Sequence, residues 1–131
     1  MPQATNVELV HRAYDAFNRR DWAAFLALVD EEVVAESRLV AMEGAYRGHE
    51  GLRRWWNDFL GAFPDYKVEI EELRDLGDVT FGHIRGWGHS APSDTPLVDP
   101  FWQLIRWRDG KCVWWRNYST EAEALHDLGM T

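Results

Sequence analysis

The stretch that decides the fold is Phe101-Trp102-Gln103-Leu104-Ile105-Arg106-Trp107, which turns through Arg108-Asp109-Gly110-Lys111 and returns as Cys112-Val113-Trp114-Trp115-Arg116-Asn117-Tyr118. Two extended, aromatic-rich runs around an Asp-Gly turn predict a β-hairpin. Both runs interleave polar groups with bulky apolar side chains, so neither face looks like the solvated face of an ordinary hairpin. We therefore expect both faces to be covered: one by helices over a pocket, the other by another strand layer or a second subunit.

The turn decides which residues share a face. A two-residue loop at Asp109-Gly110 pairs Arg108 with Lys111, whereas a three-residue loop ending at Gly110 pairs Trp107 with Lys111. We favour the three-residue loop, because Gly110 then occupies the position that requires a positive φ.

This register sorts the hairpin into two faces of different character. The face that we expect to form the pocket wall carries Phe101, Gln103, Ile105, Trp107, Val113, Trp115, Asn117 and Ser119. The other carries Trp102, Leu104, Arg106, Cys112, Trp114, Arg116 and Tyr118. This second face is too apolar to remain in water, so we expect it to form a homodimer interface.

Length and charge limit the classes of function. The 131 residues predict a single domain over 1–131, and 22 acidic against 14 basic residues leave a net charge of −8. This charge argues against nucleic acid or an anionic membrane surface as a partner. The single cysteine, Cys112, excludes an internal disulfide, and we expect it to be inert. We expect a cytoplasmic protein, since neither a secretory signal nor a long apolar run stands in the sequence.

Apolar spacing predicts three helices in the first half of the chain. The first follows a capping box, Thr5-Asn6-Val7-Glu8, and the second follows a capping residue at Asp21. Their apolar faces carry Val7, Val10, Tyr14 and Phe17 in the first, and Trp22, Phe25, Leu26 and Val29 in the second. The third, strongest pattern comprises Leu52, Trp55, Trp56, Phe59, Leu60 and Phe63, and Pro64 ends it.

Strands dominate the second half. We expect strands at residues 33–38, around Val68 and Ile70, and over 79–89, then a proline-bearing loop at 91–100 before the hairpin. A second capping box, Thr120-Glu121-Ala122-Glu123, opens a short terminal helix. This order predicts an α+β fold: a bent, antiparallel-rich sheet wrapped around helices, forming a cone that encloses a small-molecule pocket.

Four motifs spread along the chain resemble the SnoaL-like branch of the nuclear transport factor two-like superfamily. They are Ala13-Tyr14-x-Ala16-Phe17-Asn18-x-x-Asp21, Glu43-Gly44-x-Tyr46-x-Gly48-His49-Glu50-Gly51, Arg108-Asp109-Gly110-Lys111 and Glu123-Ala124-Leu125-x-x-x-Gly129. The resemblance implies a cone-shaped α+β barrel. It implies no single function, because members include isomerases, cyclases, hydrolases, binding proteins and interaction domains.

The carboxylates that members of this superfamily use in catalysis are replaced here. Positions matching the ketosteroid isomerases carry Ser37 and Gln103, the position matching limonene-type epoxide hydrolases carries Asn117, and the position matching polyketide cyclases carries Thr120. Amides and hydroxyls lack the pKa that general acid–base catalysis needs. None of these mechanisms therefore transfers intact.

Other side chains remain candidates for catalysis. His83, Arg85 and His89 stand at alternate positions of one strand, so they share a face. In a dry cavity His83 would move a proton while Arg85 tunes its pKa. The alternative is that Arg85 pairs with a nearby acid and the histidines are solvated. Tyr14 either holds a substrate oxygen with Gln103 and Asn117 or is a core tyrosine.

The expected site is a mixed aromatic and polar pocket. Its ligand-binding residues are Gln103, Asn117, Trp115, Trp56, Trp87, Phe17 and Ile105, and its catalytic residues are His83, Arg85 and Tyr14. Glu36 and Glu43 flank its mouth, most simply as solvated residues. We expect neither metal nor cofactor, and a small, largely apolar ligand, aromatic or polycyclic. The rival interpretations are a non-catalytic carrier and a dimeric interaction scaffold whose cone is filled by its own tryptophans.

Overall fold

Helices come first along the chain, as the apolar spacing predicts. The computed structural model describes residues 5–36 and 45–129, and begins with α1 (Asn6–Asn18) and α2 (Trp22–Leu26). The Thr5 hydroxyl accepts the Glu8 backbone N–H at 3.1 Å, which confirms the first capping box. The second helix is shorter than expected, because Val29 already belongs to the first strand.

A single six-stranded sheet makes up most of the remaining fold. Its strands are β1 (Val29–Glu36), β2 (Tyr46–Arg47), β3 (Lys67–Asp75), β4 (Val79–His89), β5 (Pro96–Arg108) and β6 (Lys111–Tyr118). They lie in the order β2-β1-β6-β5-β4-β3, with β1 and β6 parallel and every other neighbouring pair antiparallel. The α+β prediction is confirmed, and over the described strands the bent sheet stays open instead of closing into a barrel.

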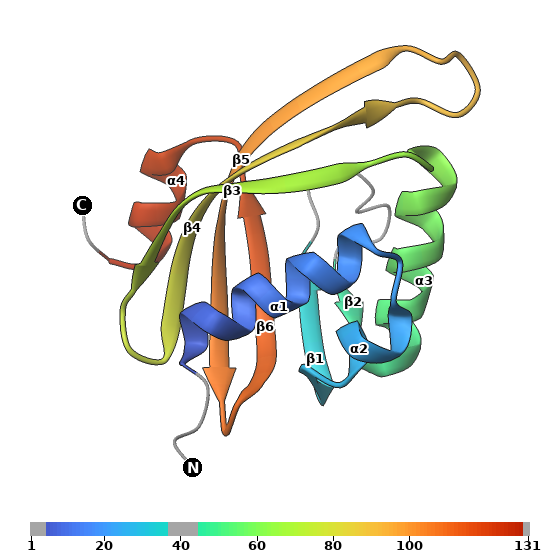
Figure 1. Cartoon of the computed structure of the whole chain (residues 1–131). Helices are drawn as coiled ribbons and strands as arrows, with labels where there is room; N and C mark the ends of the chain where they lie inside the picture. The colour runs from blue at the N-terminus through green and yellow to red at the C-terminus, as the bar shows by residue number, and fades with distance from the viewer. Residues whose placement is uncertain (1–4, 37–44, 130–131) are drawn as a thin grey trace.

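Helices lie on both sides of this sheet. Figure 1 shows α1 crossing in front of the strands, with α3 (Gly48–Ala62) at one end and α4 (Glu121–Asp127) at the other. The Thr120 hydroxyl accepts the Glu123 N–H at 3.2 Å and so caps α4. Figure 1 shows β4 and β5 extending past the end of β6, and β3 still pairs with β4 there, as far as Trp87. In the described part of the chain, no helix is long and apolar enough to cross a membrane.

The hairpin turn differs from the register that we favoured. Arg108 pairs with Lys111, so the loop has two residues, and both Asp109 (φ 52°) and Gly110 (φ 75°) adopt the left-handed conformation of a type I′ turn. A bulge follows, because the register shifts between Arg106 and Trp107.

This bulge restores the expected face for the rest of the hairpin. Gln103 pairs with Asn117 and Ile105 with Trp115, all on the pocket side. Only the segment next to the turn changes, and Cys112 faces inward there, opposite to our expectation.

The outer face of the hairpin is covered in part by the chain itself. Leu104 (2% exposed) and Tyr118 (4%) pack with Phe81 and Ala124 in a second apolar cluster beneath α4. Trp102 and Trp114 lie at its edge and are partly exposed. The expectation that all of this face needs a second subunit is therefore wrong for Leu104 and Tyr118, which the terminal helix already buries.

Candidate functional site

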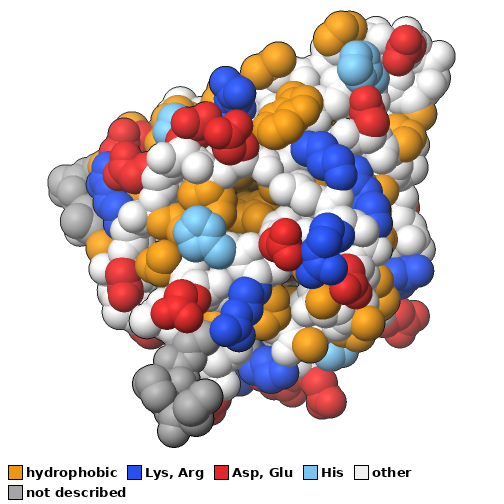
Figure 2. Space-filling model, in the orientation of Figure 1, with side chains coloured by type: hydrophobic (Ala, Val, Ile, Leu, Met, Phe, Trp, Pro, Cys, Tyr) orange, Lys and Arg blue, Asp and Glu red, His pale blue; other side chains and the backbone are white. Residues whose placement is uncertain are grey.

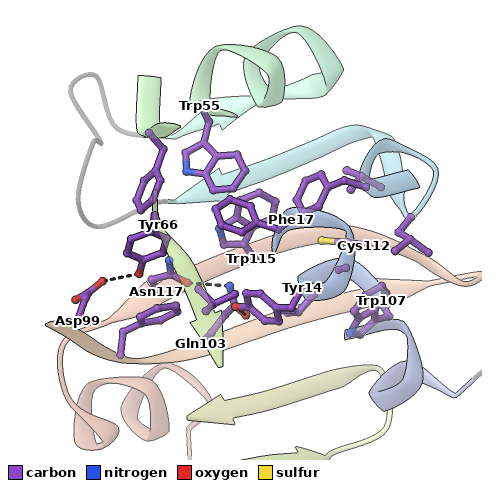
Figure 3. A pocket seen from close by; sticks show the side chains of 18 residues that line it. Tyr14, Phe17, Trp55, Tyr66, Asp99, Gln103, Trp107, Cys112, Trp115 and Asn117 are labelled. Atoms are coloured by element: carbon purple, nitrogen blue, oxygen red, sulfur yellow. Dashed lines mark hydrogen bonds between the residues drawn. The ribbon is translucent and has the colours of Figure 1, made fainter. Parts of the chain in front are cut away.

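A cavity of about 80 Å³ lies between the helices and the inner face of the sheet. Aromatic side chains make up much of its wall, and Figure 3 shows them converging from several elements. They are Tyr14, Phe17, Phe25, Trp55, Phe59, Tyr66, Phe101, Trp107 and Trp115. Figure 2 shows a hollow floored with hydrophobic side chains on the face that α1 crosses. Such an apolar interior with a few polar groups is typical of small-molecule sites.

A chain of hydrogen bonds joins three polar residues in this cavity. The Tyr14 hydroxyl donates to Gln103 Oε1, and Gln103 Nε2 donates to Asn117 Oδ1 at 3.0 Å (Figure 3). Tyr14 comes from α1, whereas the two amides face each other across β5 and β6. The chain thus runs from a helix to the far side of the hairpin. Its direction leaves the Asn117 Nδ2 group as the terminal donor.

Burial determines the protonation of two cavity residues. Part of the Tyr14 ring reaches the surface, but its hydroxyl is buried, and this burial raises the pKa of Tyr14 far above its usual 10. Burial likewise raises the pKa of the Cys112 thiol from 9 to about 12. Tyr14 therefore stays a hydrogen-bond donor at physiological pH, and Cys112 stays a thiol with little nucleophilic character.

Trp55 contributes a second donor without a protein partner. Its side chain reaches from α3 into the cavity, is 8% exposed, and its buried Nε1 has no hydrogen-bond acceptor within the described structure. Other indole groups are satisfied: Trp107 donates to Thr80 Oγ1 at 3.0 Å and Trp114 to Glu36 Oε2 at 2.7 Å. An unsatisfied buried donor is costly, so the Trp55 N–H suits a ligand acceptor.

The cavity also holds a carboxyl group that the sequence interpretation missed. Asp99 is 6% exposed, and its Oδ2 accepts the Tyr66 hydroxyl at 3.1 Å (Figure 3). We expected residues 91–100 to be a loop, but β5 begins at Pro96, which places Asp99 on the same inner face as Phe101 and Gln103. Its alternation with these two residues was the signal available in the sequence.

Most of the predicted ligand contacts do line this cavity. Phe17, Gln103, Ile105, Trp115 and Asn117 are all part of its wall, and so is Tyr14, which we predicted as a catalytic residue. Trp56 is not: it is 6% exposed and packs deeper, against Phe17 and Trp22 at ring-centroid distances of 5.5 and 5.1 Å. It supports the wall from behind.

Three predicted residues of β4 lie outside the cavity. The His83 ring stacks on Trp102 at 4.5 Å on the outer face of the sheet. Arg85 is exposed and pairs with Glu69 and Glu71, each at 3.7 Å, and Trp87 is 39% exposed. The expectation that these side chains share the pocket with Gln103 is therefore corrected.

The inner face of β4 instead carries glycines. Gly82, Ile84, Gly86 and Gly88 are buried, while the residues between them point outward. A Cβ atom on Gly86 would lie 1.8 Å from the Tyr66 hydroxyl oxygen, so this position has no room for a side chain. Close approach of neighbouring groups explains why the glycines, and not the histidines, face inward.

The remaining carboxylate and hydroxyl candidates fall elsewhere. Glu36 accepts the Trp114 indole N–H and so belongs to the outer face. Thr120 is occupied in capping α4. Ser37 and Glu43 lie outside the described residues.

A bent sheet with helices over its concave side and a cavity between them defines a cone-shaped α+β class. Within this class the SnoaL-like domain family matches residues 10–115, and the chain belongs to this family.

Solved structures with the same fold extend over nearly all of the chain. One is a nuclear transport factor 2-like protein of unknown function from Burkholderia pseudomallei (17% identity, TM-score 0.81, 95% of this chain and 97% of that one). A second is IdmH, a candidate polyketide cyclase from Streptomyces antibioticus (22% identity, TM-score 0.75, 94% of this chain and 97% of that one). A third is a candidate SnoaL-like polyketide cyclase from Jannaschia (19% identity, TM-score 0.77, 100% of this chain and 98% of that one). No curated protein sequence matches the chain.

Proposed function

We propose that this protein binds a small, largely apolar organic molecule carrying one oxygen acceptor, such as a ketone, in the aromatic cavity. The observation that carries the proposal is the hydrogen-bond chain from Tyr14 through Gln103 to Asn117, set in walls that are mainly aromatic and aliphatic. Because Asn117 Oδ1 already accepts from Gln103, its Nδ2 is the group left to donate to a ligand.

The Trp55 indole supports the same ligand chemistry. An oxygen with two lone pairs accepts two hydrogen bonds, and Trp55 Nε1 and Asn117 Nδ2 are two donors in one cavity. The volume of about 80 Å³ lies below the roughly 300–1,000 Å³ of pockets for drug-sized ligands. It therefore favours a compact ligand over a polycyclic one, which would require the aromatic walls to move.

The family relationship adds a catalytic extension to this proposal. Fold and family suggest small-molecule binding and cyclase activity, and two structural neighbours are candidate polyketide cyclases. Yet Gln103, Asn117 and Thr120 replace the family's carboxylates, so we propose binding as the primary function. We further propose that the partly exposed Trp102 and Trp114 belong to a homodimer interface, which sedimentation measures directly.

An interaction scaffold with a self-filled interior is the second candidate. The observation that favours it is the small cavity volume, since the aromatic side chains occupy most of the interior themselves. This function predicts that compact ligands change neither tryptophan fluorescence nor melting temperature.

Cyclopentanone and its hydrocarbon counterpart methylcyclopentane distinguish the candidates. We expect cyclopentanone to bind with millimolar or better affinity, about 4 kcal/mol or more. Asn117→Leu should weaken cyclopentanone by about 1–3 kcal/mol, because its oxygen loses a donor in a dry site, and leave methylcyclopentane unchanged. Equal loss for both ligands, or no binding of either, would contradict the proposal.

A further inference from the structure

The hydrogen-bond chain of the cavity has a direction, and Tyr14 stands at its start (Figure 3). An amide donates through its nitrogen and accepts through its oxygen, so the same two amides can also bond with both groups turned round. Turning both would put Asn117 Oδ1, an acceptor, at the end of the chain in place of the Nδ2 donor. The direction therefore decides whether this end of the chain suits a ligand oxygen acceptor or a ligand N–H or O–H donor.

The Tyr14 hydroxyl fixes this direction. Burial raises the pKa of Tyr14 far above its usual 10, so the hydroxyl keeps its proton and needs an acceptor. Within the described structure, its one hydrogen-bond partner is Gln103 Oε1. Cys112 also lines the cavity, but a thiol sulfur is a weak acceptor. Turning the Gln103 amide would thus leave a buried phenol proton without a good acceptor, which costs free energy.

Gln103 carries this constraint from the helix to the far strand of the hairpin. It is 8% exposed and pairs directly with Asn117 across β5 and β6, so its amide lies between Tyr14 and Asn117. Because Tyr14 donates to Oε1, the Nε2 group is the end left to face Asn117, and it donates to Oδ1 at 3.0 Å. Asn117 then presents Nδ2 to the ligand, although Tyr14 itself bonds only to Gln103 in the described structure.

We propose that Tyr14 is a positioning residue that makes the site selective for ligands with an acceptor oxygen, acting through Gln103 without touching the ligand. The inference rests on the proposed function and narrows its ligand class. Ketones, esters and ethers fit, whereas compounds whose only polar group is an N–H donor do not. With phenylalanine at position 14, either direction of the chain leaves one end of the Gln103 amide unpaired, so the two directions become close in free energy.

Cyclopentanone and pyrrole test this selectivity. Both are compact rings, but the first carries an acceptor oxygen and the second an N–H donor without an acceptor lone pair. Both are titrated by tryptophan fluorescence and by melting temperature in the wild type, in Tyr14→Phe and in Tyr118→Phe. Tyr118 lies on the outer face, where its hydroxyl donates to Asp127 at 2.6 Å, so its variant is the matched control for the loss of a phenol hydroxyl.

The expected result is a gain of binding. Tyr14→Phe should bind pyrrole at least about fivefold more tightly than the wild type, because turning the chain no longer strands a buried proton. It should bind cyclopentanone no more tightly than the wild type, and Tyr118→Phe should match the wild type for both ligands. Asp99 is unchanged in all three proteins, so any hydrogen bond from pyrrole to its carboxyl group cancels in the comparison.

The gain for pyrrole is the decisive result, because a substitution that only loosened the cavity would weaken both ligands. Unchanged pyrrole affinity in Tyr14→Phe would overturn the proposal. A preference that falls only because cyclopentanone is lost would overturn it too, since Tyr14 would then bond to the ligand itself.

A second measurement needs only the wild type. The side-chain amide protons of Asn117 should shift in the NMR spectrum when cyclopentanone is added, while those of Gln103, already bonded to Asn117, should stay in place. A shift of the Gln103 protons alone, or of neither pair, would overturn the direction of the chain even if Tyr14→Phe folds poorly.

Failure of the proposed function gives a different result from failure of this inference. If cyclopentanone does not bind the wild type, the proposed function is wrong and the inference with it. If cyclopentanone binds and Asn117→Leu weakens it, but Tyr14→Phe gains nothing for pyrrole, only the role of Tyr14 is wrong.

Discussion

The inner and outer faces of the β4–β5–β6 sheet use opposite means to satisfy polar groups. Inside, Gln103 and Asn117 bond to each other and to Tyr14 among aromatic rings. Outside, Arg85 forms exposed ion pairs with acids of β3, and His83 rests on Trp102. The inner face carries neutral amides and one carboxyl group, whereas the histidines and arginines face outward. The histidines and arginines of these strands therefore do not mark the cavity.

The largest expected effect comes from filling the inner face of β4. Gly86→Ala would place a Cβ atom 1.8 Å from the Tyr66 hydroxyl oxygen and 2.2 Å from its ring carbon Cζ. We expect the free energy of unfolding to fall by about 1–3 kcal/mol, because the ring must leave its place beside Asp99. Urea denaturation measures this change.

Gly61→Ala is the matched control for that substitution. Gly61 lies in α3, and a Cβ atom there would meet nothing within 4 Å. It should raise the free energy of unfolding by about 0.4–1 kcal/mol by restricting the unfolded chain. If Gly86→Ala were equally harmless, the close packing of Tyr66 against β4 would be refuted.

A smaller effect is expected on the outer face. His83→Ala removes the ring that stacks on Trp102, so we expect a loss of about 0.5–1 kcal/mol in the free energy of unfolding. Binding of cyclopentanone should stay unchanged, because His83 lies outside the cavity wall. Loss of binding in a folded His83→Ala protein would show that the two faces are not separate.

The smallest effect concerns a surface pair, His89 at the end of β4 and Asp65 in the turn between α3 and β3. The hydrogen bond to Asp65 raises the pKa of His89 above 6.5, and the same bond lowers the pKa of Asp65 below 3.8. The His89 contribution to stability is present below pH 6.5 and is lost as pH rises through its raised pKa. The Asp65 contribution is present above pH 3.8 and is lost as pH falls through its lowered pKa.

The pair therefore stabilises the fold most between these two values. Asp65→Asn should lower the urea midpoint slightly at pH 5 and less at pH 8, since both side chains are exposed. A larger loss at pH 8 than at pH 5 would contradict this assignment.

Local signals predicted the elements of the fold well. Thr5 and Thr120 cap helices where their capping boxes stand, and the apolar spacing around Trp55 marks α3. The pocket face of the hairpin was also predicted, although two effects cancelled. The predicted loop was one residue too long, and the bulge near Trp107 brought the rest of the hairpin back to the expected face. Helix caps, helical spacing and strand alternation depend on residues close together in the sequence, so they can be predicted from it.

The same local signals could not predict which face of β4 lies inside. Alternation shows that His83 and Arg85 share a face, but not which face is inside, because the choice depends on what packs against it. The space requirement of Tyr66, distant along the chain, makes Gly86 the inward residue. Asp99 was missed for a related reason: Pro96 and Pro100 suggested a loop, yet both lie in the part of β5 that precedes Trp102. In the described structure this part has no β6 partner and therefore tolerates proline.

The proposed function requires that donors inside the cavity form hydrogen bonds with a ligand oxygen. The Trp55 indole N–H, which has no acceptor in the described structure, reports directly on such a bond. Its proton signal, assigned by its loss in Trp55→Phe, should move downfield when cyclopentanone is added and stay unchanged with methylcyclopentane. The indole signals of Trp107 and Trp114, already bonded to Thr80 and Glu36, should respond to neither ligand. An unmoved Trp55 signal at saturating cyclopentanone would contradict the claim.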